Sequence, residues 1–102
     1  MQITTAVLRD CSGRDELEHV TLAEPGAGQV LVRIVGVGHC HTDLLARATH
    51  STSALPLVVG HERSGVVEAI AANTEGIAVG DHVVLSYDSC RRCANCLAGH
   101  PA

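Results

Sequence analysis

The sequence predicts a mainly β fold: a small, partly open β-barrel with short helices, followed by a cysteine-rich lobe. Three observations lead to this prediction. Runs rich in Val, Leu and Ile are short and are separated by glycine-containing turns, which is typical of strands. Hydrophobic residues make up 46% of the 102 residues but aromatic residues only 1%, so the core must be aliphatic. Helical periodicity is nearly absent, and short strands joined by short turns pack most naturally as a barrel.

Five strands follow from the apolar runs at residues 3–8, 17–22, 29–38, 65–71 and 82–85. The first two are expected to form a hairpin around a turn at residues 11–15. The polar stretch at residues 49–54 is interpreted as a loop. Thr42 or Asp43 is expected to cap a short helix through residues 44–46, since both residue types favour the N-cap position.

The charge pattern excludes several classes of partner. The net charge is −4 with neutral histidines, and all seven basic residues are arginines, of which only Arg91 and Arg92 are adjacent. A chain without basic clusters is a poor ligand for nucleic acid or for an anionic membrane. No apolar run reaches the length of a membrane span, and the N-terminus lacks a signal-peptide pattern. We therefore expect a cytoplasmic protein whose five cysteines are metal ligands or reactive groups rather than disulfides.

The strongest local pattern is a run of three cysteines, Cys90, Cys93 and Cys96, each separated by two residues. Thiols at this spacing can converge on one metal ion, whereas three unrelated exposed thiols would be a liability. A zinc site of three cysteines with His100 is one interpretation, and a zinc site whose fourth ligand lies beyond Ala102 is another. An iron–sulfur cluster is a third, although its usual fourth thiolate is missing.

Two further groups of metal-ligand type lie where predicted strands end. Cys40 and Asp43 follow one strand, and His61 and Glu62 follow a Val-rich run that stops at a glycine. The structural alternatives are a buried cysteine beside a helix cap and a buried histidine at a strand end. Considered together, Cys40 and His61 are expected to share a zinc ion, with Asp43 or Glu62 beside them. A catalytic zinc normally takes three protein ligands and keeps one exchangeable position.

In this order and spacing, the motifs resemble the N-terminal part of the zinc-dependent medium-chain alcohol dehydrogenases. The resemblance runs along nearly the whole chain, and the sequence is most similar to the aryl-alcohol (benzyl-alcohol) dehydrogenase branch. That branch assignment depends mainly on the segment Leu85-Ser86-Tyr87 before the cysteines. The family markers lie at residues 36–43, 59–62, 65–67, 79–84 and 99–101.

The resemblance implies a GroES-like domain over residues 1–102, incomplete at its C-terminus, with a Rossmann domain for NAD(P) absent from these residues. It also implies two zinc ions. Cys40 and His61 would be ligands of a catalytic zinc, and Cys90, Cys93 and Cys96 would hold a structural zinc. In the family pattern, the fourth structural cysteine falls just past the end of the chain, and the third catalytic ligand falls later still.

Further roles follow from the same resemblance. Thr42 would hydrogen-bond the substrate oxygen and start a proton relay, and His41 would face the cofactor phosphates. Asp43 would orient the zinc-binding imidazole, and Glu62 would sit close behind the zinc. Some relatives end the relay with a histidine at the position where this sequence has Leu45.

The implied activity is oxidation of a primary alcohol, including aromatic alcohols, to an aldehyde by hydride transfer to NAD(P). The full-length enzyme would be a homo-oligomer that acts on a small-molecule alcohol or aldehyde. Residues 1–102 alone are expected to be inactive, because no G-x-G-x-x-G fingerprint follows a strand. Two alternatives remain: a stand-alone zinc-binding module and a non-catalytic GroES-like interaction domain.

Overall fold

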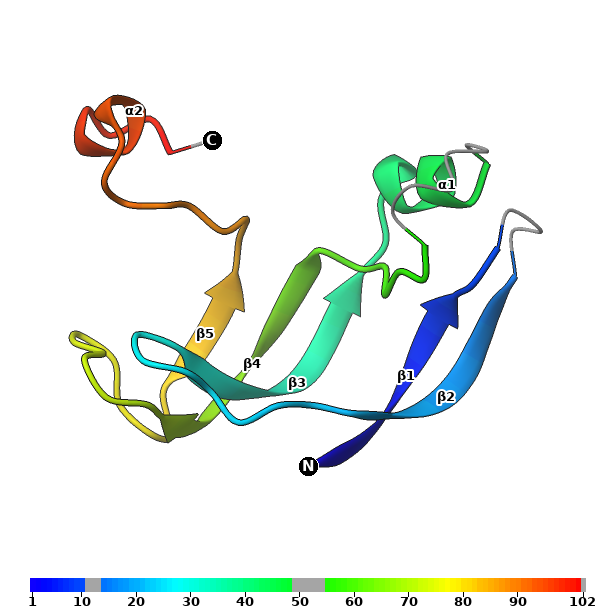
Figure 1. The fold of residues 1–102 in the computed structure, drawn as a ribbon, viewed down its shortest axis with the longest axis horizontal. Coiled ribbons are helices and arrows are strands. Elements are labelled where there is room, and N and C mark those ends of the chain that lie inside the picture. Colours follow the sequence, from blue (N-terminus) through cyan, green and yellow to red (C-terminus); the bar gives the residue numbers. More distant parts are fainter. Residues whose placement is uncertain (11–13, 49–54, 102) are drawn as a thin grey trace.

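The computed structural model describes residues 1–10, 14–48 and 55–101. Within these residues the chain forms five strands and two short helices (Figure 1). In chain order they are β1 (Gln2–Leu8), β2 (Asp15–Thr21), β3 (Val30–Gly38), α1 (His41–Ala48), β4 (Glu62–Ile70), β5 (His82–Leu85) and α2 (Ala94–Leu97). All five predicted strands are confirmed. Most of the predicted turn at residues 11–15 and the whole loop at residues 49–54 lie outside the described residues.

The strands form two antiparallel sheets. One is the predicted hairpin β1–β2, and the other has the order β3–β4–β5. A β-bridge joins the hairpin to the segment before β4: the N–H of Leu8 donates to the Leu57 carbonyl at 2.8 Å, and the N–H of Leu57 donates back at 2.9 Å. Figure 1 shows the two sheets side by side without a closed ring of strands, which agrees with the predicted partly open barrel.

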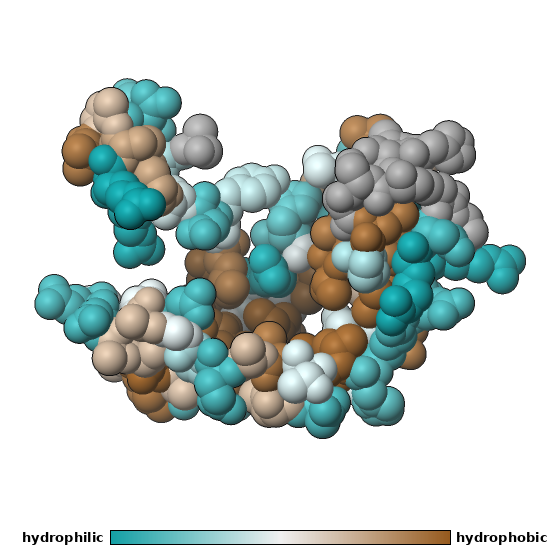
Figure 2. All heavy atoms as spheres, viewed as in Figure 1, coloured by the Kyte–Doolittle hydropathy of each residue, from teal (hydrophilic) through white to brown (hydrophobic). Residues whose placement is uncertain are grey.

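The buried core of the described residues is small and aliphatic. Its hydrophobic members are Val7, Leu8 and Val67. Figure 2 shows apolar side chains gathered in the hollow at the centre of the view, with polar side chains around its rim. No helix in the described ranges is long and apolar enough to cross a membrane.

The predicted N-cap of the first helix is wrong. Thr42 and Asp43 both lie inside the first turn of α1, which begins at His41. Cys40 is the residue before the helix, and its Sγ accepts the N–H of Thr42 at 3.3 Å. In return, Asp43 Oδ2 accepts the N–H of Cys40 at 3.0 Å. This reciprocal pair resembles a capping box, with a thiol that accepts the N–H of the second helical residue and Asp in place of Glu.

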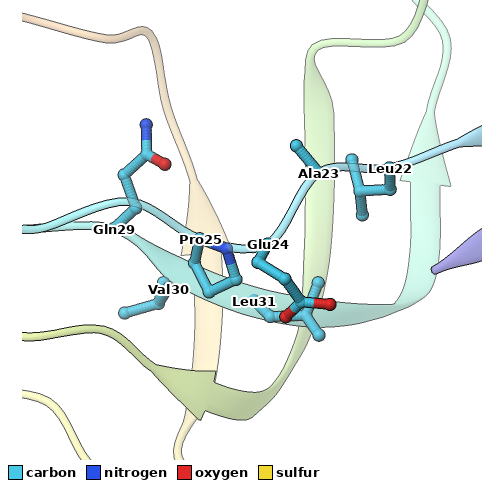
Figure 3. A pocket seen from close by; sticks show the side chains of 7 residues that line it. All are labelled: Leu22, Ala23, Glu24, Pro25, Gln29, Val30 and Leu31. Atoms are coloured by element: carbon cyan, nitrogen blue, oxygen red, sulfur yellow. The ribbon is translucent and has the colours of Figure 1, made fainter.

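Two further features of the fold are a groove beside the start of β3 and the segment that follows β5. A groove of about 420 Å³ runs between the segment Leu22–Pro25 and the start of β3 (Figure 3). None of the predicted site residues lines it. The segment after β5 leaves the sheet and carries α2, with the cysteines around it, at one end of the molecule (Figure 1).

Candidate metal centres

The end of β3 and the start of β4 bring Cys40 and His61 together. Gly38 pairs with Glu62 across the two strands, so the residues that follow the one strand meet the residues that precede the other. Cys40 Sγ and His61 Nε2 lie 3.2 Å apart. Only glycine fits at position 38, since a Cβ there would lie 2.9 Å from Glu62 Cβ. The close approach of the two strands at this glycine therefore brings the site residues together.

Asp43 holds the two sides of this site together. Its side chain is only 3% exposed, and it accepts the N–H of Cys40 and the N–H of Gly60, each at 3.0 Å. Its Oδ1 also lies 3.4 Å from His61 Nδ1. The N–H of Cys40 first, then that of Gly60 and the imidazoles of His61 and His39, hold the pKa of the Asp43 carboxyl below its ordinary value, against the opposing effect of burial. The carboxylate therefore stays charged beside the imidazole.

The donor set fits zinc. Tetrahedral zinc with usual bond lengths would place a thiolate sulfur and an imidazole nitrogen about 3.6 Å apart. The observed 3.2 Å is close to that value. A carboxylate oxygen of Glu62 joins Cys40 and His61 in a group whose ligand atoms all lie within 4.8 Å of one another. Asp43 supplies the carboxylate that commonly orients a zinc-binding histidine through its other ring nitrogen.

His41 and Thr42 occupy the first turn of α1, directly after Cys40. Both are exposed and neither belongs to the group of converging ligand atoms. Thr42 contributes its backbone N–H to the Cys40 sulfur. Among the described residues its hydroxyl has no hydrogen-bond partner, so it can meet a small molecule that approaches the metal ligands.

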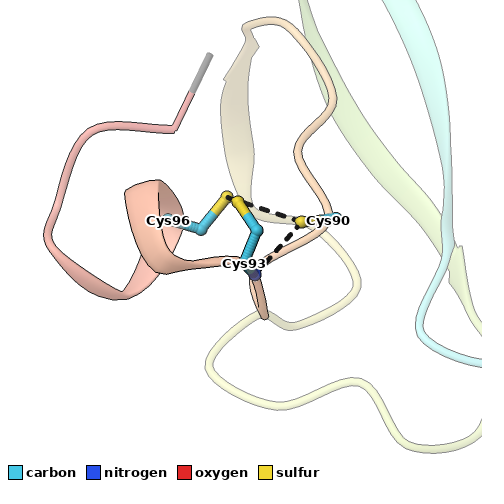
Figure 4. A group of neighbouring side chains, drawn as sticks. All are labelled: Cys90, Cys93 and Cys96. Atoms are coloured by element: carbon cyan, nitrogen blue, oxygen red, sulfur yellow. Dashed lines mark hydrogen bonds between the residues drawn. The ribbon is translucent and has the colours of Figure 1, made fainter.

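The cysteine lobe forms a second, separate centre. Figure 4 shows the side chains of Cys90, Cys93 and Cys96 pointing toward one another. The Sγ–Sγ distances are 3.7 Å for Cys90 with Cys96 and 3.5 Å for Cys93 with Cys96. Tetrahedral zinc would hold two thiolates about 3.8 Å apart, so these sulfurs are spaced for one ion. His100 is not part of the converging group; its N–H donates to the Asn95 carbonyl.

The surroundings of Cys90 in the lobe also favour its ionised form, the thiolate. The backbone N–H groups of Arg92 and Cys93, followed by the neighbouring thiols, lower the pKa of Cys90 from its usual value near 9 to about 7. The N–H of Cys93 lies 3.4 Å from Cys90 Sγ. A thiol that ionises near neutral pH is prepared for metal binding.

The sequence did not predict the contact between Tyr87 and His61. There Tyr87 served only to assign the branch of the family. The rings of Tyr87 and His61 are stacked, with centroids 5.5 Å apart and planes 20° apart. The signal lies in the strand register. Arg63 pairs with Leu85, so two further residues along each antiparallel strand place Tyr87 opposite His61.

Comparison with known proteins gives a consistent result. Residues 26–102 match the family described as the alcohol dehydrogenase GroES-like domain. Geraniol dehydrogenase from Castellaniella defragrans is 47% identical over 97 residues, which cover 95% of this chain and 26% of that protein.

Solved structures agree. Benzyl alcohol dehydrogenase from Acinetobacter calcoaceticus matches with a TM-score of 0.90 and 42% identity, over 96% of this chain and 27% of that one. An alcohol dehydrogenase zinc-binding domain protein from Burkholderia ambifaria matches with a TM-score of 0.92 and 44% identity, over 99% of this chain and 27% of that one. The chain thus spans about a quarter of the length of these relatives.

Proposed function

Because the chain belongs to the alcohol dehydrogenase GroES-like domain family of zinc-dependent medium-chain dehydrogenases, we propose that it supplies the zinc ligands and the substrate-oxygen contact of an NAD(P)-dependent alcohol dehydrogenase. The observation that carries the proposal is the 3.2 Å approach of Cys40 Sγ to His61 Nε2, beside the buried carboxylate of Asp43. The substrate is a primary alcohol, and similarity to a benzyl alcohol and a geraniol dehydrogenase favours aromatic and allylic alcohols.

Cys40 and His61 would hold the catalytic zinc, and Glu62 lies beside them. A zinc ion held there would act as a Lewis acid that polarises the alcohol oxygen. Asp43 keeps the imidazole in the orientation and tautomer that leave Nε2 free for the metal. Cys90, Cys93 and Cys96 would hold a structural zinc that orders the lobe.

Thr42 hydrogen-bonds the alcohol oxygen and receives its proton. Its exposed position, two residues after Cys40 and with an unpaired hydroxyl among the described residues, suits this role. The Leu45 side chain, one turn further along α1, contains only carbon and hydrogen and cannot accept that proton. The proton therefore leaves Thr42 to solvent. His41, exposed at the start of the same helix, would face the cofactor phosphates, because the N-terminal end of a helix favours anions.

The test is the oxidation of benzyl alcohol and of geraniol by the intact protein, measured as reduction of NAD and of NADP. Thr42→Val removes the hydroxyl at nearly constant volume and should lower kcat by about 10²- to 10⁴-fold, the usual contribution of a proton-transfer group. Thr74→Val is the matched control, since the Thr74 hydroxyl donates to the Ala71 carbonyl in a turn outside the site. Equal activity of Thr42→Val and the unaltered protein would contradict the role of Thr42.

We also propose that residues 1–102 do not oxidise alcohols by themselves. Among the described residues, the group of converging ligand atoms holds no cysteine or histidine besides Cys40 and His61. In addition, the cofactor would be bound by a domain that residues 1–102 do not include. Zinc- and NAD(P)-dependent turnover by the isolated 102 residues would overturn this. The intact protein acts in the cytoplasm, where cysteines stay reduced, and assembles as a homo-oligomer, which its mass in solution would test.

A further inference from the structure

The one aromatic residue of the chain, Tyr87, lies against His61, the histidine whose Nε2 approaches Cys40 Sγ. We propose that Tyr87 is a positioning residue for His61: its ring fixes the plane of the imidazole and connects the Cys40–His61 site to the cysteine lobe. The proposal depends on the proposed function only in that Cys40 and His61 bind a metal ion.

The contact is built into the sheet. Arg63 on β4 pairs with Leu85 on β5, and the same register continued past the strand ends sets Tyr87 opposite His61. Ring centroids 5.5 Å apart lie within the 4.5–7 Å range of favourable aromatic pairs. The Tyr87 residue is nevertheless 74% exposed. Its ring therefore does not fill a core, but it does stack on the imidazole.

Three contacts restrain the His61 ring: two come from residues at the start of α1 and one comes from the segment after β5. Cys40 Sγ approaches Nε2 at 3.2 Å, and Asp43 Oδ1 approaches Nδ1 at 3.4 Å. These two contacts lie at the two ring nitrogens. They do little to prevent rotation of the ring about the line through those nitrogens, which would tilt the ring plane. A flat ring stacked at 20° opposes that tilt. The three contacts together hold Nε2 pointing at the Cys40 sulfur.

Tyr87 also stands three residues before Cys90, the first cysteine of the lobe. The converging sulfurs of Cys90, Cys93 and Cys96 close a loop that begins three residues after the ring. When a metal orders that loop, the ring is held against the imidazole. Order in the lobe is thus passed to the Cys40–His61 site through one side-chain contact.

The experiment measures zinc affinity in the intact protein by competition with a chromophoric chelator, with Cys40→Ser used to identify which bound zinc belongs to the Cys40–His61 site. Tyr87→Ala should weaken that zinc by about 10-fold or more, as is usual when a residue that orients a metal ligand is lost. The lobe zinc should keep its affinity. Tyr87→Phe retains the ring and should restore the affinity. Val84→Ala, which trims a comparably exposed side chain on β5, is the matched control and should change neither site.

A second readout is the visible spectrum of cobalt(II) bound at the Cys40–His61 site, which should change in Tyr87→Ala and not in Tyr87→Phe. Unchanged affinity and spectrum in Tyr87→Ala would overturn the proposal, as would a loss in Tyr87→Phe equal to that in Tyr87→Ala. If Tyr87→Ala does not fold, Tyr87→Leu takes its place with the same expected loss, and retained affinity in Tyr87→Leu would overturn the proposal. Identical zinc content in Cys40→Ser and the unaltered protein would instead contradict the proposed function.

Discussion

At the scale of single residues, Asp43 does the most to organise the site. It accepts one N–H from the start of α1 and one from Gly60, and it touches the imidazole that follows. A buried carboxylate with three such partners fixes the loop before β4 against the helix. Its lowered pKa has the same origin, since each N–H or imidazole partner favours the charged form.

Asp43→Asn tests this role. The amide keeps the size of the side chain but loses the charge and one acceptor, so the His61 imidazole is oriented less firmly. We expect zinc affinity at the Cys40–His61 site to fall by about 10- to 100-fold, with the lobe zinc retained. Chelator competition measures both affinities. Glu68→Gln, which removes a carboxylate paired with Arg33 on the sheet, is the control. An equal loss in both variants would show that general electrostatics, not orientation, is responsible.

The sequence predicted Cys40, His61 and Glu62 as neighbours because thiolate, imidazole and carboxylate at strand ends are recognisable by residue type. It did not predict the capping role of Cys40 or the stacking of Tyr87. Thiols seldom cap helices, and the partner of a side chain across two strands depends on the register, which local patterns do not encode.

At the scale of elements, the register of β3 and β4 decides where the site forms. Irregularities between Leu31 and Val32 and between Ile34 and Gly36 shift the pairing before the strands reach their ends. Gly65 is needed at this point, because a Cβ there would lie 2.6 Å from Val32 Cγ1 and closer still to the Arg33 carbonyl oxygen. The close approach of the two backbones depends on a residue without a side chain.

Gly65→Ala should therefore lower the free energy of unfolding by about 1–3 kcal/mol, the usual cost of overpacking. Backbone of β3 cannot move aside as a flexible side chain could. Urea unfolding followed by circular dichroism measures the change. Gly26→Ala is the control, because the nearest atom to its Cβ would be the end of the flexible Gln29 side chain at 3.4 Å. A Gly65→Ala protein as stable as Gly26→Ala would refute the close approach.

The hairpin β1–β2 carries a pH-dependent contribution to stability. Arg9 donates two hydrogen bonds to the Glu18 carboxylate, at 2.6 and 2.5 Å, and lowers the pKa of that carboxyl from its usual 4.5. A lowered pKa stabilises the folded state above the unfolded pKa, and this stabilisation is lost as pH falls through the folded pKa.

Glu18→Gln should therefore be less stable than the unaltered protein at pH 7, with a difference that shrinks as pH drops below 4.5. Thermal unfolding over a pH series measures it. Glu75→Gln, which changes an exposed turn residue, should show no such trend. A stability difference for Glu18→Gln that stays constant down to pH 3 would mean that the ion pair is not its cause.

Strand positions were predictable because aliphatic runs bounded by turn residues mark them, but the start of β4 was predicted three residues too late. β4 was expected from residue 65 and begins at Glu62. Residues 62–64 are not apolar, since this end of the strand is only partly covered, yet they pair with Gly36, Val37 and Gly38. Backbone pairing at a partly exposed strand end leaves no hydrophobic pattern to read.

At the scale of the whole molecule, the fold separates two groups of metal-ligand side chains. One lies at the β3–α1–β4 junction, and the other lies on the lobe after β5 (Figures 1 and 4). Several large apolar side chains of the described strands stay exposed, including Val35, Val37 and Val84. Zinc binding at the two ligand groups would stabilise this open barrel with its small core, because the free energy of binding adds to the free energy of folding.

The central claim is that this chain carries two separate zinc sites, and zinc content of the intact protein tests it most directly. Two zinc ions per chain are expected in the unaltered protein. Cys40→Ser should keep only the lobe zinc, and Cys93→Ser should keep only the zinc at Cys40 and His61. One zinc per chain in the unaltered protein, or two retained in Cys40→Ser, would contradict the account.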